Sequence, residues 1–61
     1  MNIDSMISEY ENERTTLIMA LHLTEPNDIE RRMEISEQIN EIDEIIEELK
    51  EQRSKNYKHR N

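Results

Sequence analysis

The spacing of the aliphatic residues in the second half of the chain is the feature that most limits how this sequence can fold. Ile35, Ile39, Ile42, Ile46 and Leu49 follow one another at steps of four, three, four and three residues. Because a helix turns about 100° per residue, these side chains form one apolar stripe along one helix face. A ladder of glutamates runs at the same steps on the side that should face water. Its members are Glu30, Glu34, Glu37, Glu41, Glu44, Glu48 and Glu51.

The composition restricts the chain to one small helical domain. It has 61 residues, no Gly, no Cys and a single Pro. Without Gly, phosphate-cradling loops and tight hairpins are disfavoured, and without Cys neither a disulfide nor a thiolate metal site is expected. No apolar run approaches the ~18–20 residues that cross a bilayer, and the first residues lack the pattern of a signal peptide. We therefore expect an all-α, cytoplasmic protein that binds no cofactor, no metal and no membrane.

A short break divides the sequence into two helices. The residue before Pro26 is pushed away from the helical region of backbone space, which ends the first helix. Asn27, followed three residues later by Glu30, resembles a capping box that starts the second helix. A connection this short sets two helices side by side and antiparallel. The expected domain is a hairpin over residues 1–56, with helices at 3–23 and 28–56, a turn at 24–27 and a basic tail at 57–61.

The second helix is longer than the first, and the charge reverses near its end. Counting back from the turn places Leu21 near Arg32 and leaves everything after Gln52 without a partner in its own chain. Residues 1–51 hold all fifteen acids and four bases, whereas residues 52–61 hold four bases and no acid. The net charge of −7 disfavours nucleic-acid binding by the main body. The basic end either contacts phosphates weakly or simply suits the negative end of the helix dipole.

The end of the first helix is apolar nearly all round, which is more than one partner helix can cover. Exposed contiguous apolar surface usually marks a contact with another molecule. We therefore predict that the hairpin associates with itself, as a homodimer that forms a four-helix or coiled-coil-like bundle, or with another protein that the sequence does not identify. The predicted interface residues are Leu17, Ile18, Met19, Leu21, Leu23 and Ile45.

Arg14 occupies a position on the apolar stripe of the first helix. A guanidinium is costly to bury unless it is paired, so it should meet a carboxylate such as Asp43 or Glu37. A single polar residue on such a stripe is also a way to fix the register and the oligomeric state of packed helices. Arg14 is therefore predicted to set the register of the hairpin.

The glutamate ladder allows three interpretations. Dinuclear metal sites in helical bundles need inward-facing glutamates with Glu-x-x-His pairs, and neither His22 nor His59 stands in such a pair. The carboxylates rise on average about 5 Å apart, loosely like a row of phosphates, so mimicry of a nucleic acid is a second interpretation. The third is a solvated face with basic neighbours, and such faces are common in helical proteins.

Two segments, Tyr10 to Leu17 and residues 36–40, match the sequence pattern of a known family in part. They resemble the small aspartyl-phosphate phosphatases that control sporulation, which are helical hairpins acting on a response regulator. The first helix of that family reads apolar-Glu-x-x-Arg-x-x-Leu, as does the segment from Tyr10 to Leu17. The family signature Ser-Gln-Glu-Leu-Asp falls on residues 36–40, Ser-Glu-Gln-Ile-Asn. The Gln and Glu are exchanged here, and the Asp has become Asn40. The resemblance implies Ser36, Gln38 and Asn40 as alternative catalytic residues.

The sequence predicts a function in protein–protein interaction, as a small adaptor, assembly factor or inhibitor that presents an acidic helix face and an apolar patch. No catalytic residues are expected under this interpretation, because no pair of groups suited to proton transfer is fixed by spacing. The alternative is a phosphatase acting on a sporulation response regulator.

Overall fold

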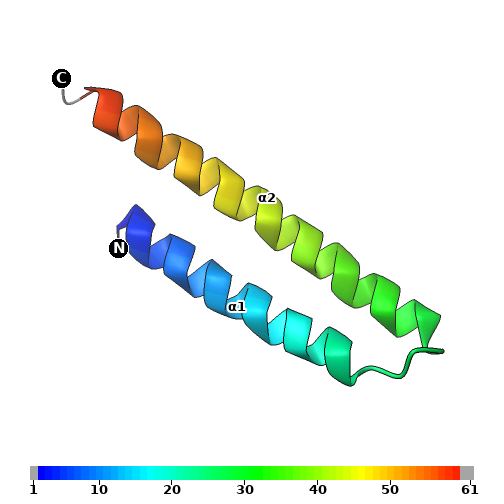
Figure 1. Ribbon diagram of the computed structural model, residues 1–61. Helices are drawn as coiled ribbons and strands as arrows, with labels where there is room; N and C mark the ends of the chain where they lie inside the picture. The colour runs from blue at the N-terminus through cyan, green and yellow to red at the C-terminus, as the bar shows by residue number, and fades with distance from the viewer. Residues whose placement is uncertain (1, 60–61) are drawn as a thin grey trace.

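Two long helices packed against each other form the whole of the described fold, a hairpin (Figure 1). The computed structural model describes the backbone of residues 2–59 and the side chains of residues 2–55. Helix α1 spans Ile3–Leu23 and helix α2 spans Ile29–His59. The helices run antiparallel, and the hairpin measures 53 × 15 × 13 Å. The predicted all-α hairpin is therefore confirmed.

Side chains and the turn define where each helix begins and ends. The Asn2 Oδ1 accepts a hydrogen bond from the Ser5 N–H at 2.7 Å and so caps α1. At the other end of α1, Thr24 is extended, and its hydroxyl donates to the Ala20 carbonyl at 2.7 Å. The cap of α2 is Asp28, whose Oδ1 accepts from the Arg31 N–H at 3.3 Å. The predicted Asn27 cap was therefore wrong by one residue.

The bounds of α2 differ from the predicted 28–56 at both ends. The helix begins at Ile29, because Asp28 acts as its cap and lies outside the helical turns. It continues to His59, three residues further than expected. The side chains of the predicted basic tail at 57–61 lie outside the described part of the structure.

The apolar stripes of the two helices meet to form the core. Ile7 of α1 packs with Ile42, Ile46 and Leu49 of α2, and all four are buried. Partly buried side chains complete this cluster: Ile3, Met6, Tyr10, Leu17 and Ile45. All seven glutamates of the ladder are exposed. The faces of α2 predicted from the spacing are thus confirmed.

Arg14 interrupts this core. Leu21 and Arg32 are neighbours, since the Arg32 guanidinium donates to the Leu21 carbonyl at 3.4 Å. Arg14 on α1 and Ile39 on α2 each lie seven residues, or two helical turns, from that contact, so they share one layer of the hairpin. Ile39 is only half-buried, while Ile35, one turn nearer to the hairpin turn, is 2% exposed. The guanidinium of Arg14 pairs with Asp43, so α1 contributes no fully apolar side chain to this layer of the core.

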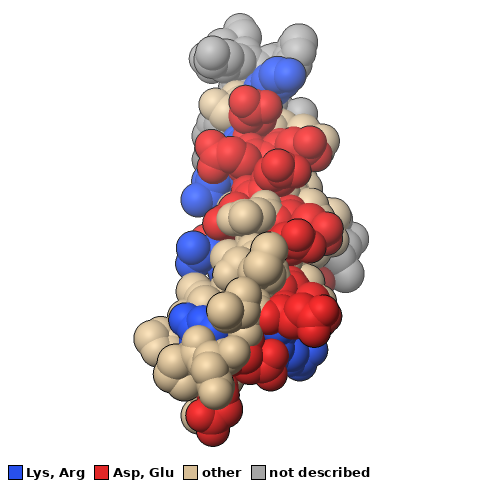
Figure 2. Space-filling view, turned by 90° about the vertical axis from the view of Figure 1, so that its right-hand side faces the viewer, with Lys and Arg blue, Asp and Glu red and all other residues tan. Residues whose placement is uncertain are grey.

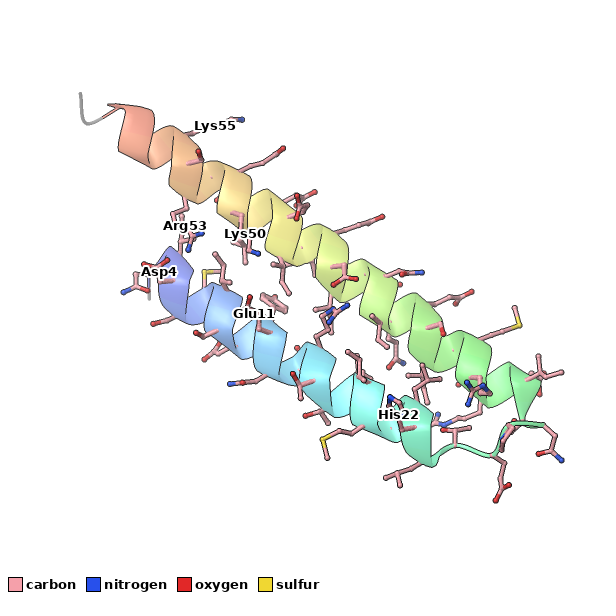
Figure 3. All side chains as sticks on the ribbon, viewed as in Figure 1. Asp4, Glu11, His22, Lys50, Arg53 and Lys55 are labelled. Atoms are coloured by element: carbon pink, nitrogen blue, oxygen red, sulfur yellow. The ribbon has the colours of Figure 1, made fainter. Side chains whose placement is uncertain are left out.

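The end of α2 is less isolated than the sequence suggested. The Arg53 guanidinium lies 2.9 Å from the Asp4 Oδ1 at the start of α1, and Figure 3 shows the two side chains meeting. The prediction that everything after Gln52 lacks a partner in its own chain was therefore wrong for Arg53. The long arginine side chain spans the offset between the helix ends, which counting turns alone does not take into account.

Candidate protein-interaction surface

The large exposed apolar side chains gather around the turn of the hairpin. Among the described residues they are Met19, Leu23, Ile29 and Met33, with 60%, 85%, 67% and 59% of their surface exposed. All four fall within fifteen residues of one another in the sequence. Figure 2 shows uncharged surface at the centre and left of the lower half of the molecule, the turn end, interrupted by basic side chains, with carboxylates to its right, above it and at the lowest tip. The large exposed apolar side chains of the described residues are therefore concentrated at the turn end.

An open hollow of about 400 Å³ lies beside the start of α2. Its apolar lining comes from Leu21, Pro26, Ile29 and Met33, so both helices and the turn contribute to it. Its remaining lining residues are polar: Arg32, Ser36, Glu37 and Asn40. We call this the turn hollow. A concave apolar surface with a few polar groups at its edge is the usual form of a site that receives a side chain or ligand.

A second open hollow, of about 680 Å³, lies further along the hairpin and is highly charged. The Arg14 guanidinium and the Asp43 carboxylate form an ion pair in it, with 2.5 Å between Nε and Oδ1. This pair confirms one of the two predicted partners of Arg14. The hollow is also lined by Glu11, Thr15, Glu44, Ile46, Glu47 and Lys50, and we call it the charged hollow. Its four carboxylates outnumber its two cations.

One line of residues on α2 connects the two hollows. Seven residues follow one another at alternating steps of four and three, beside the buried stripe. The line is apolar at its start, neutral and polar at Ser36 and Asn40, and charged at its end. We call it the second stripe of α2. Its members, all lining one of the two hollows, are Ile29, Met33, Ser36, Asn40, Asp43, Glu47 and Lys50.

The residues predicted for the interface fall into three groups. Met19 and Leu23 are well exposed, as expected of positions off the buried stripe. Leu17 and Ile45 are half-buried and pack against the core cluster, so they stabilise the hairpin itself. The remaining two, Ile18 and Leu21, are half-buried.

The predicted interface did not include three residues that line the turn hollow: Pro26, Ile29 and Met33. The available signal was the spacing of Ile29 and Met33, four residues apart and off the buried stripe. That spacing alone is also compatible with a wider core face on α2. With 67% and 59% of their surface exposed, Ile29 and Met33 belong to the outer surface of the hairpin and not to its core.

The three residues implied by the phosphatase resemblance do not converge. Ser36 and Asn40 line the turn hollow, and both are exposed. Gln38 is also exposed, but it does not line that hollow and lies about 200° around the helix from Ser36. Within the described side chains there is no group of three or more His, Asp or Glu suited to hold a metal ion.

Comparison of the chain with protein-family models, with curated proteins and with solved structures gives no match. Over the described residues, neither helix combines the length and the apolar character needed to cross a bilayer.

Proposed function

We propose that this chain acts by protein–protein interaction, as a helical hairpin whose turn end is the contact surface. The observation that supports this proposal is the position of the four large exposed apolar side chains: Met19, Leu23, Ile29 and Met33. In a chain with 38% charged residues, such side chains would be expected singly and scattered. Their concentration at one end of a 53 Å rod indicates a surface that another molecule covers.

The outer face of α1 is the part of this surface that we assign to a second copy of the chain. Met19 and Leu23 are four residues apart and so lie on one face of α1. Burying an aliphatic side chain contributes about 1.5–3 kcal/mol, and a symmetric dimer buries each of these residues twice. Since association costs at least about 4 kcal/mol, the expected dimer is a weak one.

Sedimentation equilibrium at tens of micromolar should therefore show a dimer. Met19→Gln and Leu23→Gln should each weaken the association at least about tenfold, because each removes apolar area from both copies. Asn12→Gln is the matched control, since Asn12 lies on the same line of α1 two turns from Met19 and is exposed. A fully helical native chain that remains monomeric at these concentrations would contradict the assignment.

The alternative function, dephosphorylation of a response regulator, makes a different prediction. Ser36 and Asn40 share the turn hollow, but Asn40 cannot serve as a carboxylate base. Gln38 could orient a water, as an amide does in other phosphoryl-transfer sites, but it lies elsewhere on the helix. We expect no faster loss of radiolabel from a phosphorylated sporulation-type regulator when this chain is added. A rate increase that Ser36→Ala and Gln38→Ala abolish would establish the phosphatase instead.

A further inference from the structure

We propose that the second stripe of α2 binds an amphipathic helix of a partner protein, apolar at one end and basic at the other. This inference rests on the proposed function in protein–protein interaction and names the chemistry of the partner. It concerns a different surface from the outer face of α1. The two hollows lie along this one stripe, and a helix is the element whose side chains repeat at the matching steps.

The apolar end of the stripe indicates which side chains one end of the partner helix should carry. Ile29 and Met33 stand one helical turn apart, and Leu21 and Pro26 form the apolar wall beside them. A partner helix with two aliphatic residues three or four positions apart would cover both side chains. Methionine adapts to differently shaped aliphatic partners because it is unbranched and flexible.

The charged end of the stripe indicates which side chains the other end of the partner helix should carry. Glu11, Glu44 and Glu47 line the charged hollow and are exposed, and among the described residues none of the three has an ion-pair partner. Asp43 is already engaged by Arg14. Lys50 projects into the same region, between the helices and near Glu11, as Figure 3 shows. The excess of carboxylates favours lysine or arginine in the partner.

The distance between the two ends sets the length of the partner. Eleven residues separate Met33 from Glu44 and fourteen separate it from Glu47, which corresponds to roughly 16–21 Å along α2. The aliphatic and basic groups of the partner should therefore lie about 11–14 helical residues apart. A second copy of this chain fits poorly, because parallel stripes place carboxylates against carboxylates and antiparallel stripes place carboxylates against apolar side chains. The net charge of −7 also disfavours a nucleic acid or an anionic membrane.

A synthetic, fluorescently labelled helical peptide provides the test. It has two leucines one turn apart near one end, four lysines on the same face near the other, and alanine elsewhere; a second peptide has the reverse order. At least one should bind the full chain, as measured by fluorescence anisotropy. The affinity should fall as the NaCl concentration rises, because the lysines meet exposed carboxylates.

Matched variants locate the bound peptide. Met33→Gln should weaken its binding about tenfold and Glu47→Gln several-fold, whereas Glu48→Gln should leave it unchanged. Glu48 carries the same charge as Glu47 and is exposed, but it lies about 100° further around α2. If neither peptide binds, or if Glu48→Gln weakens binding as much as Glu47→Gln, the inference is wrong.

Sedimentation of the same variants separates this inference from the proposed function. Met33→Gln should leave the dimer intact, and Met19→Gln should leave peptide binding intact. If Met33→Gln disrupts the dimer, a second copy occupies the second stripe and the inference is overturned. A dimer without peptide binding overturns the inference alone, while the absence of both overturns the proposed function as well.

Discussion

Replacing Ile42 by alanine should lower the free energy of unfolding by about 2–5 kcal/mol. Ile42 is buried in the core cluster with Ile7, Ile46 and Leu49, so the shorter side chain leaves a cavity there. A domain of this size has a total stability of only about 3–5 kcal/mol. We therefore expect Ile42→Ala to be largely unfolded at room temperature, as measured by circular dichroism during urea titration.

Glu44→Gln is the matched control for this prediction, because Glu44 lies two residues away on the opposite side of α2 and is exposed. Its substitution should change the stability by only a few tenths of a kcal/mol. Both variants must be measured at one protein concentration, since association stabilises the folded state by mass action. Equal losses of stability in the two variants would contradict the assignment of Ile42 to the buried face of α2 and of Glu44 to its exposed face.

The sequence contains most of the information that fixes the fold. The four-three steps from Ile35 to Leu49 predict a helix that buries one face, and the structure has that helix. Pro26 limits where the first helix can end. The sequence does not decide which residue caps α2, because the adjacent residues Asn27 and Asp28 are equally good capping residues.

The proposed contact surface was harder to predict than the fold. Met19 and Leu23 stand out because their segment is apolar all round, which one partner helix cannot cover. Ile29 and Met33 lie next to the buried stripe, so the sequence alone does not tell whether α1 is wide enough to cover them. The Arg53–Asp4 pair depends on how far a flexible side chain reaches across the helix ends, and no periodicity contains that information.

Arg14 places an ion pair between the two helices at a position where the stripe of α1 would otherwise carry an apolar side chain. Its layer is less well buried than its neighbours, since Ile39 remains half-buried although it belongs to the same stripe as Ile35 and Ile42. The ion pair with Asp43 adds little, because the two side chains are 41% and 46% exposed and such pairs contribute about 0–1 kcal/mol. It does connect one position on α1 to one on α2, which disfavours helix pairings shifted by a turn.

Arg14→Leu should therefore stabilise the hairpin, by about 1 kcal/mol. A leucine there would extend the apolar stripe of α1 from Tyr10 to Leu17 without a gap and cover Ile39. For a chain of this length the melting temperature should rise by about 4–8 °C, as measured by thermal unfolding. Arg14→Gln is the control: it removes the same charge but adds no aliphatic surface, so it should be no more stable than the native chain. A leucine variant that melts at or below the glutamine variant would show that the ion pair, and not the apolar contact, governs the stability of this layer.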